Sequence, residues 1–170
     1  MRRLLDFLYD AAAWLAALAM IGVLVMVLTS ILGRLMHFHV PGTDAYAGYA
    51  MAAAGFLALA HTLKKGEHIR VTLFIGRLGG RARKGFEIWA LSASMLLSGL
   101  LAFFAVRLVW VSYQFNDMST SNDATPLWIP QLAMAIGCVI LCMAFVDEWV
   151  LELRGLRDHN AGSEEAKHNE

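Results

Sequence analysis

The residues best suited to chemistry in this sequence are two cysteines, six histidines and one short segment dense in charge. That segment reads HTLKKGEHIRVTLF, and within seven residues it contains Lys64, Lys65, Glu67, His68 and Arg70. Such a segment can be a reactive site, a nucleic-acid patch, or a stretch held on one side of a membrane. The sequence that flanks it helps to choose between these readings.

The cysteines and histidines do not form a pattern that suits a redox or metal centre. Cys138 and Cys142 lie four residues apart in an apolar stretch. In a regular helix their Cβ atoms are too far apart for a disulfide, so we interpret them as small buried hydrophobic residues. His37 and His39 are too few for a zinc site. His61 is the only histidine expected inside a span, whereas haem needs facing histidines, and the sequence therefore predicts no cofactor and no metal.

Long stretches without charge dominate the composition, which is 58% hydrophobic and 16% charged. A soluble domain carries roughly a quarter charged residues. A helix needs about 20 apolar residues to cross the hydrocarbon core of a bilayer. Four charge-free stretches approach or exceed that length, at residues 11–33, 45–63, 88–106 and 124–146. We therefore expect an all-α integral membrane protein with four transmembrane helices.

The expected spans cover about residues 8–36, 44–64, 86–114 and 129–153, in one membrane domain of residues 1–154. Between the second and third spans, apolar and basic residues recur at helical spacing. This predicts a short amphipathic helix in the headgroup layer at about residues 69–79. The loop NDMSTSNDATP is polar and is expected to lack regular structure. The polar tail, residues 155–170, is expected to be disordered.

The distribution of basic residues predicts the orientation of the chain. Lys and Arg accumulate on the cytoplasmic side of membrane proteins. Of the 14 Lys and Arg residues, only Arg34 and Arg107 fall on the side opposite the termini. Both termini are therefore expected in the cytoplasm, and the charged segment lies at the cytoplasmic end of the second span. Anionic lipid and orientation explain its basic residues better than nucleic acid does, so no nucleic-acid partner is predicted.

Small residues mark one face of the second span, where Gly48, Ala52 and Gly55 recur at helical spacing. Small residues let helices approach closely in lipid. This face is expected to pack either within the subunit or against another chain. Arg107 lies one residue beyond the third charge-free stretch. It either extends its head group to the outer interface or contacts a partner chain.

The centres of the expected spans contain no Asp, Glu, Lys or Arg. Proton relays and coupled-ion sites in transporters usually need such residues, and no pair of interrupted helices suggests an inverted repeat. The chain is therefore expected to be a membrane scaffold or accessory subunit and not an enzyme. The alternatives are a self-contained small transporter that works as an oligomer and a membrane-anchor subunit of a redox enzyme.

Four segments resemble the small membrane subunit of TRAP transporters, the DctQ-like family. They are GRLMHFHVPGTDAYAGYA, GFLALAHTLKKGEHIRVTLFIGRL, GGRARKGFEIW and TPLWIPQ. Together they span about residues 20–150, and the GEHIRV block is the most specific of them. Asp44 departs from the family pattern, since Glu is more usual there.

The resemblance implies a small permease subunit of a tripartite, sodium-coupled transporter in the bacterial inner membrane. A large multi-span subunit would carry the sodium and substrate sites, and a periplasmic solute-binding protein would deliver an organic acid. The small subunit would enlarge the static part of an elevator-type transporter as a scaffold without chemistry of its own. Carried over by position, its candidate contacts with the partner or with lipid are Arg34, Asp44, Lys65, Gly66, His68 and Ile69.

Overall fold

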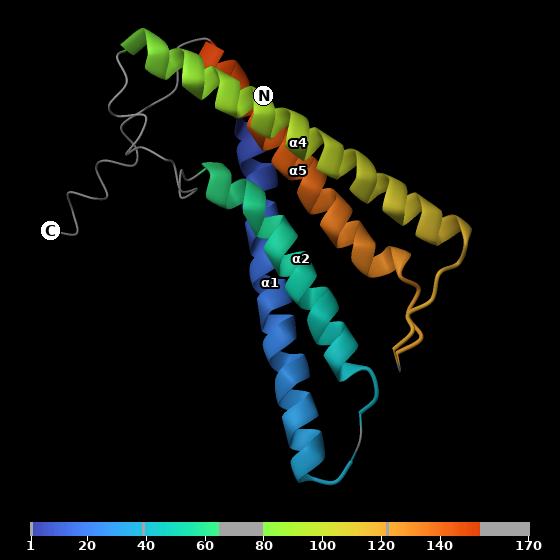
Figure 1. The fold of residues 1–170 in the computed structure, drawn as a ribbon. Coiled ribbons are helices and arrows are strands. Elements are labelled where there is room, and N and C mark those ends of the chain that lie inside the picture. The colour runs from blue at the N-terminus through green and yellow to red at the C-terminus, as the bar shows by residue number, and fades with distance from the viewer. Residues whose placement is uncertain (1, 39, 65–79, 122, 154–170) are drawn as a thin grey trace, which may run out of the picture.

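The computed structural model describes residues 2–38, 40–64, 80–121 and 123–153. These ranges form four helices, shown in Figure 1: α1 (Arg2–Leu35), α2 (Thr43–Lys64), α4 (Gly80–Gln114) and α5 (Trp128–Leu153). The prediction of an all-helical chain is confirmed. The predicted interfacial helix at 69–79 and the predicted disordered tail at 155–170 lie outside the described residues.

Two helical hairpins make up the fold. Helix α1 packs along α2, α4 packs along α5, and the two pairs are joined where α2 packs against α5. The hairpins splay apart in Figure 1, and the α4–α5 loop returns toward the start of α2. We call the end with the α1–α2 turn and the α4–α5 loop the loop end, and the opposite end the terminal end. Helices α2 and α5 are thus the central elements, because each packs against a helix of both hairpins.

Small residues allow the close contact between the hairpins. One cluster of buried residues lies toward the terminal end and consists of Tyr9, Ala12, Ala60, Leu63, Ile140, Leu141 and Ala144. A second cluster consists of Ala102, Ala105, Ala135 and Cys138, with Phe56 packed against it. Gly137 lies where α5 meets α2, since a Cβ built on it would be 2.6 Å from the backbone carbonyl of Phe56. Close helix contact through small residues is the usual packing mode in lipid.

Polar side chains also tie α4 to α5. The indole Nε1 of Trp149 donates a hydrogen bond of 2.9 Å to the Ser92 hydroxyl, which itself donates to the Ile88 carbonyl at 2.8 Å. At the loop end, the rings of Tyr113 and Trp128 meet edge to face, with their centroids 5.7 Å apart. Aromatic residues favour the two membrane interfaces, so the contact between Tyr113 and Trp128 indicates the level of one of them.

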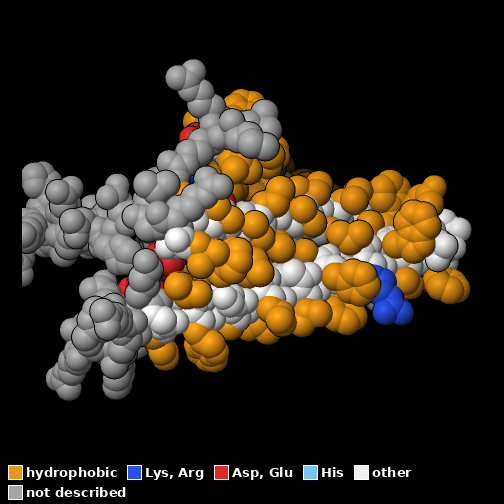
Figure 2. All heavy atoms as spheres, turned by 90° about the horizontal axis from the view of Figure 1, so that it is seen from above, with side chains coloured by type: hydrophobic (Ala, Val, Ile, Leu, Met, Phe, Trp, Pro, Cys, Tyr) orange, Lys and Arg blue, Asp and Glu red, His pale blue; other side chains and the backbone are white. Residues whose placement is uncertain are grey.

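Three of the helices in the described ranges are long and apolar enough to cross a membrane: α1, α4 and α5. Their length and hydropathy identify the chain as a membrane protein. Helix α2 is not among the three, because Ala, Gly, Tyr and Thr replace most of the large aliphatic residues in its sequence. Its 22 residues nevertheless extend about 33 Å, at 1.5 Å per residue. In Figure 2, hydrophobic side chains cover most of the described surface on the side of the molecule that is seen.

Two helices extend beyond the spans expected from hydropathy. Helix α1 begins at Arg2, whereas the first expected span began at about residue 8. Helix α4 begins at Gly80, whereas the third expected span began at about residue 86. Hydropathy reports only the part of a helix that suits hydrocarbon, whereas backbone hydrogen bonding continues into the polar interface. The expected spans are therefore shorter than these two helices.

Candidate functional site

The predicted small-residue face of α2 is open in the structure. Gly48, Ala52 and Gly55 are all exposed. A Cβ built on Gly48 or on Gly55 meets no atom within 4 Å. The buried residues of α2 are others: Thr43, Ala54, Leu57, Ala60 and Leu63. Among the described residues, no atom from outside α2 packs on the two glycines of this face, and packing against another chain stays a prediction.

Two further residues belong to this face. Asp44 and Met51 are exposed and follow the same helical spacing, and Met51 has 62% of its surface accessible. We define the open α2 face as Asp44, Gly48, Met51, Ala52 and Gly55. Sequence reasoning missed Met51, although its position between Gly48 and Gly55 on the same face was a usable signal. The open α2 face therefore combines a small-residue surface with one flexible apolar side chain and a carboxylate at the loop end.

Arg34 and Asp44 come together at the loop end, where both line a cavity of about 120 Å³. Ser30 from α1 and Ser121 from the α4–α5 loop also line it. Within the described residues, neither Arg34 nor Asp44 forms an ion pair with a charged side chain. Both charges are thus available to a partner at this end of the molecule.

A hydrogen-bond network joins the α4–α5 loop to α2 at the loop end. The Tyr49 hydroxyl lies 2.9 Å from Ser119 Oγ and 3.1 Å from Asp123 Oδ2. Ser119 Oγ donates to Asp123 Oδ1 at 2.7 Å, and Thr125 Oγ1 donates to the Tyr46 hydroxyl at 3.1 Å. We call these five residues the loop-end network. Hydrogen bonds, foremost from Ser119, hold the pKa of Asp123 below its usual value.

The loop that carries this network is ordered in part by backbone hydrogen bonds. Met118 and Pro126 form an antiparallel bridge, flanked by hydrogen bonds from Ser119 N to the Thr125 carbonyl and from Leu127 N to the Asp117 carbonyl, both 2.9 Å. In the described residues no helix or strand is assigned between α4 and α5, which agrees with the expected lack of regular secondary structure, although an isolated bridge orders part of the loop. The side-chain contacts that tie the loop to α2 join residues 70–79 positions apart, so the local composition could not reveal them.

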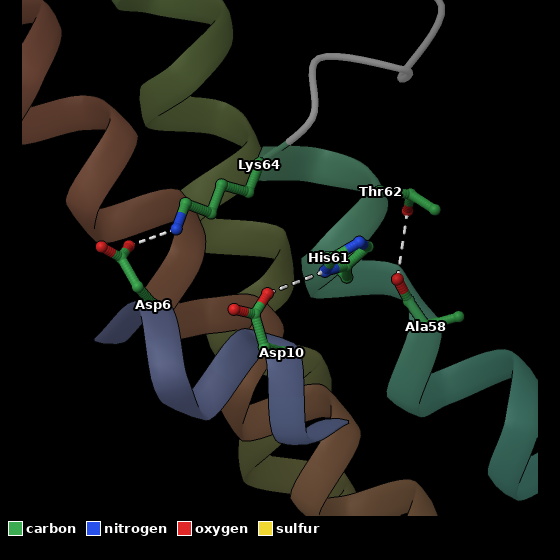
Figure 3. A network of polar contacts seen from close by, with 6 residues as sticks. All are labelled: Asp6, Asp10, Ala58, His61, Thr62 and Lys64. Carbon is green, nitrogen blue, oxygen red and sulfur yellow. Dashed lines mark hydrogen bonds and ion pairs between the residues drawn. The ribbon is translucent and has the colours of Figure 1, made fainter. Parts of the chain in front are cut away.

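A second polar network joins α1 to α2 at the terminal end (Figure 3). Lys64 pairs with Asp6, and Nδ1 of His61 lies 3.7 Å from Oδ1 of Asp10. The Lys64 ammonium also lies 5.3 Å from the centroid of the Tyr9 ring. We call Asp6, Asp10, His61 and Lys64 the terminal-end network. Sequence reasoning did not single out the two aspartates as contacts. Residues three or four apart lie on one face of a helix, so Asp6 and Asp10 share a face of α1, and His61 and Lys64 share a face of α2.

Arg107 lines a groove on the surface formed by α4 and α5. The groove has a volume of about 440 Å³ and is lined by α4 residues from Leu101 to Val111 and by Met134 of α5. Arg107 is its only charged lining residue. In the ranges that the structure describes, its guanidinium makes no hydrogen bond and no ion pair.

The remaining predicted contact residues, Lys65, Gly66, His68 and Ile69, lie outside the described residues. Among the residues that are described, no group of three or more His, Cys, Asp and Glu side chains is placed to hold a metal ion. Cys138 and Cys142 are free thiols, the first of them buried.

These features define a small helical membrane protein. The sequence matches the family described as "Tripartite ATP-independent periplasmic transporters, DctQ component" over residues 23–155. The chain belongs to this family, whose members are the small permease components of TRAP transporters. The resemblance seen in the sequence is thereby confirmed. No curated protein matches the chain.

Proposed function

We propose that this chain is the static scaffold of a sodium-coupled TRAP transporter that takes up an organic acid across the bacterial inner membrane. Its partners are a large multi-span permease subunit and a periplasmic solute-binding protein. The open α2 face is the observation that carries the proposal, because it is a small-residue surface on which no helix packs within the part of the chain that the structure describes.

The composition of α2 supports a protein partner on that face. Among the described helices, α2 alone is not a candidate membrane span by length and hydropathy, and it already packs against α1 and α5. Small residues stabilise a membrane protein when another helix packs closely on them, because helix association in a bilayer depends on close van der Waals contact. Small residues that face only lipid make no such contact. We therefore propose that α2 is the fourth span and that a helix of the large subunit covers Gly48, Ala52 and Gly55.

Charge supports the orientation with both termini in the cytoplasm. The terminal end then holds the cytoplasmic basic residues, and the loop end faces the periplasm. In this orientation the cavity with Arg34 and Asp44 lies where the large subunit and the solute-binding protein meet the small subunit. The predicted amphipathic helix at about residues 69–79 would rest on the cytoplasmic surface, with Lys65, Gly66, His68 and Ile69 at the preceding turn.

The absence of charge from the span centres supports a passive role. Residues 11–33, 45–63, 88–106 and 124–146 include no Asp, Glu, Lys or Arg. A site that couples sodium to a carboxylate substrate in the membrane needs ionisable groups or broken helices. We propose that the large subunit supplies these and that the small subunit supplies a rigid surface, so the chain carries out no catalysis.

Substitution of the open glycines tests the proposal. The variant Gly48→Leu/Gly55→Leu should fold normally, because among the described residues no atom beyond the adjoining α2 backbone lies within 4 Å of either Cβ position. It should lose most co-purification with a co-expressed large subunit, and uptake should fall in parallel. The matched control is Leu28→Phe, which enlarges an exposed residue of α1 and should leave both unchanged.

Two results would overturn the proposal. One is full co-purification and full uptake by the double leucine variant. The other is accumulation of a carboxylate by the small subunit alone in proteoliposomes with an imposed sodium gradient, which would show that the chain is itself a transporter.

A further inference from the structure

The Arg107 groove has the dimensions of one bilayer leaflet. Its lining on α4 extends from Leu101 to Val111, which is about 15 Å along the helix axis. The hydrocarbon core is about 30 Å thick, so one leaflet is about 15 Å deep. A partner helix that crosses the membrane would be expected to contact a surface nearer to the full 30 Å. The extent of the groove therefore favours a lipid chain over a spanning helix.

The charge of the groove lies near a membrane interface. Arg107 directly follows the charge-free stretch 88–106, and the contact between Tyr113 and Trp128 marks the interface beyond it. The other lining residues are apolar, as Leu101, Phe104 and Leu108 illustrate. An occupant that complements this lining has an apolar chain and an anion near Arg107.

Within the described residues, the Arg107 guanidinium has no counter-ion, although its side chain is exposed beside the groove. A cation at the edge of the hydrocarbon is costly unless it reaches the interface or meets an anion. The phosphate of a phospholipid lies at this depth and accepts hydrogen bonds from an arginine.

We propose that the Arg107 groove binds an anionic phospholipid of the loop-end leaflet, with one acyl chain against Leu101, Phe104 and Met134 and the phosphate at Arg107. The interaction does not depend on the large subunit, so it stands or falls separately from the scaffold role. A bound lipid here would fill the space between α4 and α5 on the surface of the bundle.

Native mass spectrometry of the purified full chain tests this. The delipidated protein is incubated with equal amounts of phosphatidylglycerol and phosphatidylcholine with identical acyl chains, and the retained lipid is counted. The wild type should retain phosphatidylglycerol in preference. Arg107→Gln should reduce that preference about fivefold, the size expected for one basic residue near an anionic surface.

Two matched variants separate the head group from the chain. Arg34→Gln removes the other basic residue of the loop end, which lies outside the groove, and should keep the preference. Leu108→Trp fills the groove from a position that is 45% exposed, and it should lower retention of both lipids together. Intact folding of each variant is checked by its elution as a single species in detergent.

Any of three results would overturn the proposal. They are an unchanged phosphatidylglycerol preference in Arg107→Gln, an equal loss in Arg34→Gln, and specific cross-linking of Arg107→Cys to a co-expressed large subunit. The last result would assign the groove to a protein interface.

Discussion

Gly137 of α5 lies directly against the backbone of Phe56 in α2. A Cβ built on Gly137 would be 2.6 Å from both the carbonyl carbon and the carbonyl oxygen of Phe56. Neither is the end of a flexible side chain, so neither can move aside without shifting a helix. This contact sets how closely the two hairpins approach, and it makes the glycine a requirement of the fold.

Gly137→Ala should destabilise the bundle by about 1–3 kcal/mol, the usual cost of forcing extra volume into a packed interior. The measurement is unfolding of the purified chain in mixed micelles with increasing SDS. Gly55→Ala is the matched control, because its Cβ meets no atom within 4 Å, and its unfolding midpoint should stay close to that of the wild type. Equal midpoints for Gly137→Ala and the wild type would contradict the packing argument.

The ion pair between Asp6 and Lys64 should make a small, measurable contribution to the α1–α2 contact. Both side chains are substantially exposed, at 49% and 41%, and exposed pairs typically contribute about 0.2–1 kcal/mol. Asp6→Lys should lower stability, and adding Lys64→Asp should restore part of the loss. A double-mutant cycle in the same SDS assay yields the coupling energy. No coupling, or coupling unaffected by 0.5 M salt, would argue against the pairing.

The loop-end network should weaken in acid because Asp123 has a lowered pKa in the folded protein. The folded state then binds fewer protons than the unfolded state, so the contribution of Asp123 to stability is complete above its usual pKa of 3.8. It is lost as the pH falls through the lower folded pKa. Spin labels at Ala45→Cys and Thr120→Cys, in a background with Cys138 and Cys142 replaced by Ser, should report a distance distribution that broadens, relative to pH 7, only as the pH is titrated below 3.8.

Asp123→Asn in the same labelled background is the control for that experiment. An amide does not titrate in this range, so its distance distribution should be the same at pH 7 and throughout the acid titration. If the labelled parent protein and Asp123→Asn give the same distance distribution at pH 7 and throughout the acid titration, the network does not depend on the Asp123 charge.

The hydrogen bond between Trp149 and Ser92 should stabilise the α4–α5 pair at the terminal end. Ser92→Ala leaves the partly buried indole N–H without its 2.9 Å acceptor, which should cost about 1 kcal/mol. Ser92→Thr keeps a hydroxyl and should retain most of the stability. The unfolding midpoints of the three proteins in SDS give the comparison, and identical midpoints for Ser92→Ala and the wild type would refute the role of this bond.

Much of the architecture can be predicted from the sequence because hydropathy and helical spacing are local properties. Charge-free stretches such as 88–106 identify apolar helices without knowledge of their neighbours, and the GEHIRV block directed attention to the correct family. The same local reasoning placed Gly48, Ala52 and Gly55 on one face of α2. It left open what covers that face, because a small-residue surface looks the same in sequence whether a helix of the same chain or of another chain packs on it.

Contacts between distant segments came only from the three-dimensional arrangement. Tyr49 and Asp123 are 74 residues apart, and Asp6 and Lys64 are 58 apart. Each pair exists because two helices pack in a particular register, which neither segment specifies alone. The distinction between Gly55, which is open, and Gly137, which is closed against Phe56, has the same origin. The chain's local chemistry sets where helices form, whereas the packing of those helices sets which residues meet and which stay available to a partner.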